Sequence, residues 1–378
     1  MDLHIILQTL FTVVFRMNTF LNKHKKGLVS FVKLIVFIIV FAILFINISY
    51  MLRPSENETK GIEEFYTQKE NSMDVVYIGG SVCIVSWMPY TAWESNGIPS
   101  YSFGKSSLMA NSVKYMIKEV EKSQSPELYV IDLRPFQYTQ DKFDGEPMRA
   151  LANTMPYSLN RISMIYNSMD HINNIANKLD KASYYVDMLL YHQLTDNLRL
   201  NLFSGKNDKN ITNESKGFLF IDKHDEISLP DNSAIKKEMA VSKNAEECLK
   251  DVMNYLKNTN KKALFVVSPY QESEIDREQY NYLKRIIIDN GFDYLNANDY
   301  IYELSIDYKR DFYDFAHMNI FGAEKYTKYL SNYIAKKYNL EDKRKKTEYA
   351  DWNNNLLGWK QQESIHKNNI ENIIPKQK

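Results

Sequence analysis

A serine that follows two glycines is the first feature of the sequence that could carry out chemistry. Gly79, Gly80 and Ser81 come directly after the apolar run VVYI. Two glycines permit a sharp turn and a close approach of backbone atoms. A serine at the start of a helix would lie among free backbone N–H groups, which stabilise a negatively charged oxygen. The alternative is a serine that only caps the helix.

An aspartate and a histidine three residues apart form the second feature. Asp314 and His317 belong to the segment DFYDFAHMNIFGAEK, residues 311–325. On a turn or a first helical turn, this spacing places both side chains on one side. The carboxylate can then accept a hydrogen bond from one imidazole nitrogen, while the other nitrogen takes the proton of a serine hydroxyl. The same spacing occurs in surface pairs. A metal site that also uses Asp311 is a further alternative, although no second histidine lies at ligand spacing.

Further candidates follow other apolar segments. Gly104 ends IPSYSFG, and its N–H could donate to an oxyanion, although a plain turn would also place a glycine there. Arg134 follows ELYVIDL. Together with Arg149 and Arg161 it could bind an anionic polymer, but arginines in ordinary salt bridges have the same pattern. Cys83 lies two residues after the serine, and we expect it to be buried.

Short apolar strands that alternate with helices must position these residues. We expect strands at residues 74–81, 98–104, 127–133, 263–269 and 292–298, and helices at residues 107–122, 245–256, 272–290 and 317–337. Such alternation predicts an α/β fold with a parallel sheet covered on both faces. Ligands of these sheets bind beyond the carboxyl ends of the strands, and the candidate residues fall at such ends.

Taken in order, these motifs resemble the SGNH (GDSL-type) hydrolase superfamily over most of residues 74–335. The resemblance implies a three-layer α/β/α sandwich that hydrolyses or transfers acyl esters, and no cofactor or metal is expected. It implies that Ser81 is the nucleophile, His317 the base and Asp314 its orienting carboxylate. It also implies that the backbone N–H groups of Ser81 and Gly104 form the oxyanion hole.

The sequence departs from that family at two places. Gly80 stands where the family has an acidic residue, and the G-x-N-D block is absent. At the matching strand end the sequence reads Asp-Leu-Arg-Pro, residues 132–135. Either Arg134 replaces the asparagine of that block, or the oxyanion hole has backbone donors alone. We expect Gly80, Arg134 and Asn319 to lie against the substrate.

An apolar run near the N-terminus predicts a membrane helix. Residues 28–52 contain one charged side chain, Lys33, and about 20 apolar residues suffice to cross a bilayer. Lysines precede this run at positions 23, 25 and 26, so the N-terminus is expected in the cytoplasm and the rest outside. We expect an uncleaved anchor. Residues 3–15 form either an interfacial helix or a segment before a true start at Met17.

The expected organisation is therefore one anchor and one interrupted domain. It comprises a cytoplasmic stub (1–27), the transmembrane anchor (28–52), a stalk (53–73), an extracytoplasmic domain (74–338) with an insertion at about 136–240, and a loosely ordered polar tail (339–378). The chain has 47 basic and 47 acidic residues, and this balance argues against a nucleic-acid partner. Two cysteines without a C-x-x-C motif exclude a disulfide framework and a thiolate zinc site.

Membrane-anchored SGNH-like proteins of the bacterial cell envelope resemble the chain more closely. They share its ending, D-x-x-H-x-N-x-x-G-A-x-K, which here comprises Asp314, His317, Asn319, Gly322, Ala323 and Lys325. They include D-alanyl transfer (DltD-like) proteins of teichoic-acid modification and polysaccharide O-acetylation proteins. The resemblance implies a serine esterase or acyltransferase that acts on D-alanyl or O-acetyl esters of teichoic acid or polysaccharide. The alternative is a non-catalytic accessory that binds the polymer or a membrane O-acyltransferase.

Overall fold

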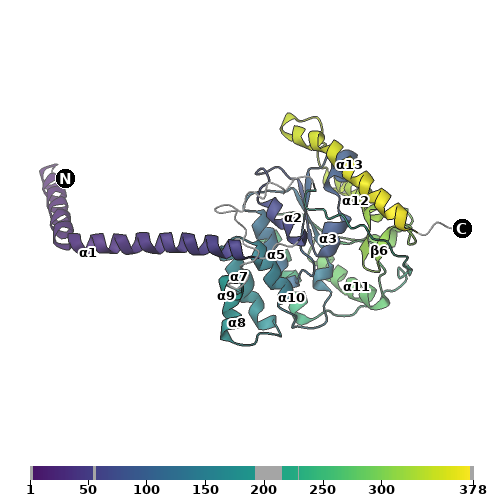
Figure 1. The fold of residues 1–378 in the computed structure, drawn as a ribbon, viewed down its shortest axis with the longest axis horizontal. Helices are drawn as coiled ribbons and strands as arrows, with labels where there is room; N and C mark the ends of the chain where they lie inside the picture. The colour runs from purple at the N-terminus through teal and green to yellow at the C-terminus, as the bar shows by residue number, and fades with distance from the viewer. Residues whose placement is uncertain (1–2, 54–56, 192–214, 229, 375–378) are drawn as a thin grey trace.

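The computed structural model describes residues 3–53, 57–191, 215–228 and 230–374. A single long helix, α1 (Leu3–Leu52), projects from an α/β domain (Figure 1). Within α1, the 24 residues of Val29–Leu52 are long and apolar enough to cross a membrane. Their large apolar side chains are mostly exposed rather than packed against the domain. Length and composition of the expected anchor are thus confirmed.

Five parallel strands form the central sheet, in the order β2-β1-β3-β4-β5. Their bounds are β1 (Val75–Gly79), β2 (Ser100–Gly104), β3 (Leu128–Asp132), β4 (Ala263–Val267) and β5 (Asp293–Asn296). The chain moves outward from β1 to β2 in one direction and then to β3 in the other. Such a reversal of strand order opens a crevice at the carboxyl ends of the strands, and the residues after β1 lie in it.

Helices cover both faces of this sheet. One face packs against α2 (Asn57–Phe65), α5 (Ala110–Val120), α10 (Lys243–Asn258) and α11 (Glu274–Asp289). The other packs against α3 (Ser81–Ser86), α4 (Pro89–Asn96) and α12 (Ile320–Tyr338). Alternate residues of β1 belong to the two cores: Val76 and Ile78 to one, Val75 and Tyr77 to the other. Burial on both faces explains why the strands are continuous apolar runs.

The insertion between β3 and α10 is helical in its described part. It contains α6 (Glu146–Thr154), α7 (Leu159–Ser168), α8 (Lys178–Ser183) and α9 (Met188–Tyr191). Residues 192–214 of the predicted insertion lie outside the described residues. In Figure 1, α7, α8 and α9 lie at the end of the domain from which α1 projects.

Residues 57–73, the described part of the expected stalk after Arg53, are instead partly packed into the domain. Ile62 and Phe65 of α2 are fully buried, and the ring of Phe65 lies 4.4 Å from that of Phe103. The tyrosine hydroxyl of Tyr101 donates to the carbonyl of Gly61 at 2.6 Å. The segment has many charged residues, and for this reason its sequence did not predict α2 as an amphipathic helix. The apolar side of α2 faces the edge strand β2.

The described part of the C-terminal segment, up to residue 374, is also ordered, in contrast to the expected loose tail. It forms α13 (Ala350–Ile373), which buries Trp352, Trp359 and Ile370. The tryptophan rings lie about 5 Å from that of Tyr90, at 5.0 and 5.4 Å. A composition rich in Lys, Asn and Gln suggests disorder. These large apolar side chains lie on one helical face and pack α13 against the domain.

Candidate active site

Ser81 lies at the carboxyl end of β1, where the chain turns into α3. The turn requires Gly79, because a Cβ atom there would lie 2.5 Å from the Cβ of Asp132 on the neighbouring strand. At Gly80 the nearest atoms to a Cβ would be 3.9 Å away. The predicted strand, glycine turn and helix start are therefore confirmed, and they place the serine in the crevice of the sheet.

Ser81, His317 and Asp314 form a continuous chain of hydrogen bonds. The serine Oγ lies 2.7 Å from the histidine Nε2. The Nδ1 atom of the same ring lies 2.9 and 3.1 Å from the two carboxylate oxygens of the aspartate. The side chains of His317 and Asp314 are 19% and 37% exposed, so the site is accessible from solvent. In this geometry, the imidazole can take the serine proton while the carboxylate holds its orientation.

A short antiparallel hairpin presents the histidine. Strands β6 (Phe312–Asp314) and β7 (His317–Met318) pair with an irregular register. The N–H of Ala316 donates to Asp314 at 2.8 Å, which fixes the carboxylate within the turn. The ring of Tyr313 is stacked on the imidazole at 5.1 Å, with 3° between the ring planes. The predicted helix from residue 317 thus begins three residues later, at Ile320, and the hairpin takes its first residues.

Asn319 holds this hairpin to α12. Its side-chain oxygen accepts from the N–H of Phe321 and caps the helix. Its amide donates to the carbonyls of Arg310 (2.7 Å) and Phe312 (3.1 Å), and the residue is only 1% exposed. These three bonds use the carbonyl oxygen and the amide group. The structure thus shows that Asn319 holds the hairpin to α12, while its predicted contact with substrate stays a prediction.

Gly322 and Lys325 secure the same junction. A Cβ at Gly322 would lie 2.4 Å from the backbone oxygen of Asp311, so only glycine allows α12 to approach the hairpin this closely. Lys325 donates to the buried carboxylate of Asp311 and to the carbonyl of Ser305, each at 2.7 Å. Asp311 therefore faces the lysine rather than His317 and Asp314, which leaves the alternative metal site without its third ligand.

A buried carboxylate occupies the carboxyl end of β3, next to the glycine turn. Asp132 is fully buried and accepts hydrogen bonds from the N–H groups of Gly80 (3.4 Å) and Arg134 (3.2 Å). Burial raises the pKa of the Asp132 carboxyl, while the charge of Arg134 and the backbone hydrogen bonds oppose that increase. The family asparagine would stand at this strand end, so the local electrostatics differ from those that the resemblance implies.

Arg134 extends from this strand end with unused donors. Its guanidinium carbon lies 3.9 Å from the centre of the Tyr270 ring. Among the described residues, its buried Nε and Nη2 atoms have no hydrogen-bond partner. Buried donors are normally paired, so these two are exceptions, although their burial closes them to a ligand unless neighbouring side chains move. Arg134 remains a candidate substrate contact, and Tyr270, which the sequence analysis did not identify, supports it.

The predicted oxyanion donors occupy adjacent strand ends. Gly104 pairs in register with Gly79, and the next N–H, that of Lys105, donates to the Gly79 carbonyl at 3.2 Å. The N–H of Ser102 donates in the other direction, to Lys216. Alternate N–H groups of a strand point the same way, so that of Gly104 also faces away from β1. The oxyanion roles of Gly104 and the Ser81 N–H stay predictions.

Other candidates from the sequence have structural partners. Arg149 pairs with Asp180 at 3.0 Å, and Arg161 pairs with Asp187 at 2.5 Å. Both arginines are therefore held inside the insertion rather than presented to a polymer. Cys83 is fully buried, and burial raises the pKa of its thiol well above the usual range, which makes it a poor nucleophile.

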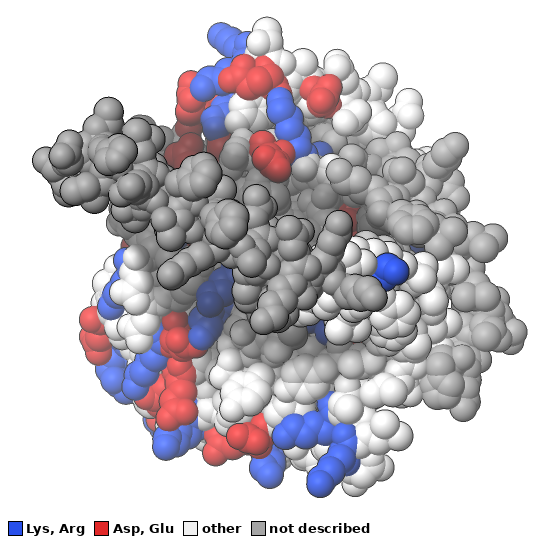
Figure 2. Space-filling model, turned by 90° about the vertical axis from the view of Figure 1, so that its left-hand side faces the viewer, with Lys and Arg blue, Asp and Glu red and all other residues white. Residues whose placement is uncertain are grey.

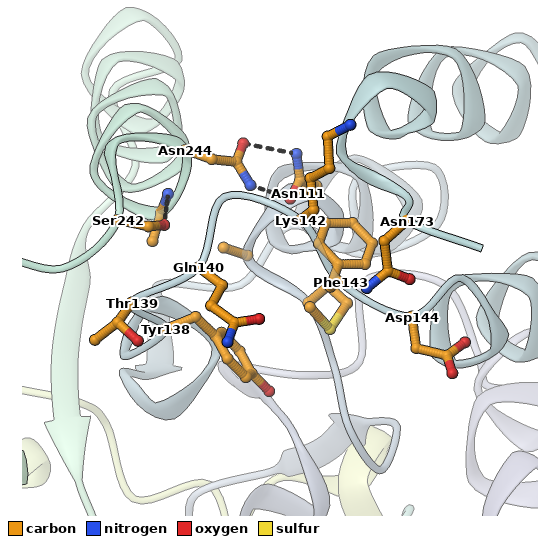
Figure 3. Close-up of a pocket in the computed structure, with 13 residues that line it drawn as sticks. Asn111, Tyr138, Thr139, Gln140, Lys142, Phe143, Asp144, Asn173, Ser242 and Asn244 are labelled. Carbon is orange, nitrogen blue, oxygen red and sulfur yellow. Dashed lines mark hydrogen bonds between the residues drawn. The ribbon is translucent and has the colours of Figure 1, made fainter. Parts of the chain in front are cut away.

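A polar pocket of about 340 Å³ lies where α5 and α10 begin (Figure 3). The amides of Asn111 and Asn244, one from each helix, are joined by two hydrogen bonds of 3.0 and 3.1 Å. Tyr138, Gln140 and other residues of the loop after β3 complete the lining. Both helices begin on the carboxyl side of the sheet, so the pocket opens on the same side as the serine.

Comparisons with protein-family models, with curated proteins and with solved structures give no match to this chain. Functional inference therefore depends on the geometry of the site and on the motifs of the sequence.

Proposed function

We propose that this chain is a membrane-anchored serine acyl esterase or acyltransferase whose domain lies outside the cytoplasmic membrane. The observation that carries the proposal is the chain of hydrogen bonds from Ser81 through His317 to Asp314. Its serine and histidine are 236 residues apart in sequence, yet their reactive atoms lie 2.7 Å apart at the carboxyl edge of a parallel sheet. This arrangement supports nucleophilic catalysis on a carbonyl carbon.

Each step of the proposed reaction has a residue to accept or return the proton. The Ser81 oxygen attacks the acyl carbonyl and His317 takes the hydroxyl proton. The imidazolium returns that proton to the departing alcohol, which leaves the acyl group as an ester of Ser81. Water or an acceptor hydroxyl then gives its proton to His317 and attacks the acyl carbon. The bond from that carbon to the Ser81 oxygen breaks, and the imidazolium returns the proton to this oxygen. Asp314 stabilises the imidazolium in both steps.

Three features support a cell-envelope polymer as the substrate class. The apolar stretch of α1, preceded by lysines, favours an anchor with the domain outside. The positive charge of Arg134, at the carboxyl end of β3, suits an anionic polymer such as a teichoic acid. The amide and hydroxyl groups around Asn111 and Asn244 suit sugar hydroxyls. The proposed acyl groups are D-alanyl or O-acetyl, on teichoic acid or polysaccharide, as the resemblance to DltD-like and O-acetylation proteins implies.

A fluorophosphonate probe tests the serine mechanism directly. We expect covalent labelling of the full chain in detergent, and loss of labelling in Ser81→Ala. Ser163→Ala, which changes an exposed serine of α7, is the matched control and should label like wild type. Labelling of Ser81→Ala at the wild-type rate would reject the proposal.

The second candidate is a non-catalytic accessory that binds the polymer or a membrane O-acyltransferase. The observation that favours it is Asp132, an acceptor at the position where the family asparagine supplies a donor. In this case Ser81→Ala should leave acylation of the envelope intact in cells, whereas deletion of residues 28–52 should abolish it. Loss of acylation in Ser81→Ala would exclude the accessory role.

A further inference from the structure

The end of α1 is built into the domain by a buried cluster of charges. Arg53 directly follows the helix and is 6% exposed. Its Nε donates to Asp187 at 2.5 Å, and its Nη1 donates to the carbonyl of Met155 at 3.0 Å. The other carboxylate oxygen of Asp187 accepts from Arg161 at 2.5 Å. The side chains of Asp187 and Arg161 are fully buried, so one aspartate joins α1 to α7 through two arginines.

Aromatic contacts extend this junction. The hydroxyl of Tyr50, in the last turn of α1, accepts from the N–H of Tyr157 at 2.9 Å, and their rings lie 5.6 Å apart. The guanidinium of Arg53 lies 4.4 Å from the Tyr50 ring. Separating a buried ion pair exposes uncompensated charge and is strongly unfavourable. The direction in which α1 leaves the domain is therefore fixed, and it is the helices of the insertion that fix it.

The helices around this junction expose large apolar side chains. On α7, the residues at positions 159, 162 and 166 share one face, opposite the buried Arg161. We define the membrane-proximal face as these three residues with their neighbours on α8 and α9: Leu159 (82% exposed), Ile162 (45%), Tyr166 (71%), Leu179 (64%), Leu189 (40%) and Leu190 (42%). These helices lie at the end of the domain from which α1 projects, and large exposed apolar side chains at such a place favour contact with a partner or a membrane.

Charge and position both favour a lipid partner. Lys178 and Lys181 are exposed on either side of Leu179, a pattern that suits an apolar side chain among anionic headgroups. Figure 2 looks along the direction of α1 onto this end of the molecule, and its lower half has uncharged residues at the centre with charged residues towards the edge. Because α1 ends at this face, a bilayer that α1 crosses would lie directly against it.

We propose that the membrane-proximal face contacts the lipid bilayer crossed by α1. This contact would hold the domain in one orientation relative to the membrane. Figure 1 shows β6, which carries Asp314, towards the end of the domain opposite α1. In this orientation, the hairpin of β6 and β7 points away from the membrane, towards polymer beyond the lipid headgroups. This inference depends on α1 spanning the membrane and not on the chemistry at Ser81.

Quenching of a fluorophore by brominated lipids in nanodiscs tests whether this face contacts the bilayer. The full chain carries Cys248→Ser and one new cysteine with an environment-sensitive fluorophore, and Cys83 stays buried. The test position is Ile162→Cys, and the matched control is Leu357→Cys, a 70% exposed position on α13. With brominated lipids, we expect the fluorophore at position 162 to lose most of its emission and the one at position 357 to keep it.

Two outcomes would overturn the proposal. Equal quenching at positions 162 and 357 would mean that the face does not meet lipid. An emission spectrum at position 162 that indicates an apolar environment in nanodiscs with several chains, but not in nanodiscs with a single chain, would mean that a second copy covers the face. Tyr166→Cys is a second test position on the same face in case the first variant fails to fold. Repeating the measurement in Ser81→Ala separates this proposal from the catalytic one, because the quenching should be unchanged.

Discussion

Replacing Asn319 separates the two roles that this residue could have. The sequence places it beside the substrate, whereas in the structure its side chain caps α12 and binds two carbonyls of the hairpin. If the role is structural, Asn319→Ala should destabilise the domain and slow catalysis only through the position of His317. If the role is substrate binding, the free energy of unfolding should stay at the wild-type value and the acyl-transfer reaction should be lost.

The expected loss in the free energy of unfolding follows from the individual hydrogen bonds of Asn319. Loss of the cap costs about 1 kcal/mol. Both carbonyls lose the Asn319 amide, but that of Phe312 keeps the N–H of Asp225 as a partner at 3.0 Å, so the Arg310 carbonyl is the one left unpaired. A polar group left unpaired in a partly buried place costs about 1–2 kcal/mol. Asn319→Ala should therefore lower the free energy of unfolding by about 2–3 kcal/mol. Asn319→Ser keeps a capping oxygen and should lose about half as much.

Tryptophan fluorescence and probe labelling measure the two effects separately. All four tryptophans are buried in the domain, at positions 87, 93, 352 and 359, so urea unfolding of the full chain in detergent reports the domain alone. The fluorophosphonate labelling rate is measured on the same samples under conditions in which each variant is folded. We expect a graded series in stability, from wild type through Asn319→Ser to Asn319→Ala, with labelling that falls in the same order. Abolished labelling with unchanged stability in Asn319→Ala would refute the structural role.

Four further changes test other parts of the structure. Asp314→Asn should slow fluorophosphonate labelling by roughly 10³–10⁴-fold, because the asparagine favours the wrong imidazole tautomer; a rate near that of wild type would contradict the proposed relay. Gly322→Ala should cost about 1–3 kcal/mol in urea unfolding, because its Cβ would lie 2.4 Å from a backbone oxygen, whereas the control Gly358→Ala, with open space around it on α13, should be neutral or stabilising. Trp359→Ala should cost about 3–5 kcal/mol and raise hydrogen exchange throughout α13; unchanged exchange would mean that the helix is held by other contacts. Burial raises the pKa of Glu272 to about 7 from an ordinary value of 4.5, so the folded state holds this proton more tightly and stability should fall as pH rises between these values, by up to about 3 kcal/mol. Glu272→Gln should flatten that decline, and parallel profiles for both proteins would exclude this carboxyl as the cause.

The parts of the fold that the sequence predicts are those in which local pattern and burial agree. Strands β1, β3 and β4 are buried on both faces, so their apolar runs are visible without any knowledge of neighbours. The turn into Ser81 is predicted because glycine is needed wherever backbones approach closely. The spacing of Asp314 and His317 predicts their contact, although a hairpin rather than a helical turn provides it.

The parts that sequence analysis missed depend on partners far away in the chain. Segment 339–378 is polar on average, and only Tyr90 and its neighbours on α4 explain why Trp352 and Trp359 are buried. Asn319 has the same sequence context whether it caps a helix or binds a substrate. Arg161 reads as a surface cation, yet it is fully buried because Asp187, 26 residues later, neutralises it.

If Ser81 is the nucleophile that we propose, the electrostatics beside it determine how well an oxyanion is stabilised. A charged carboxylate at Asp132 would raise the energy of a second negative charge on the substrate oxygen, because both would lie in a poorly solvated crevice. Burial raises the pKa of this carboxyl and so opposes its ionisation, while the adjacent guanidinium of Arg134 favours the ionised form. An oxyanion bound by the guanidinium of Arg134 would compete with Asp132 for the same positive charge. Proton uptake by Asp132 as the oxyanion forms would remove that competition. Under the proposed serine mechanism, the arginine and the aspartate at the end of β3 would act as one unit, and Arg134 would stabilise an oxyanion best with Asp132 protonated.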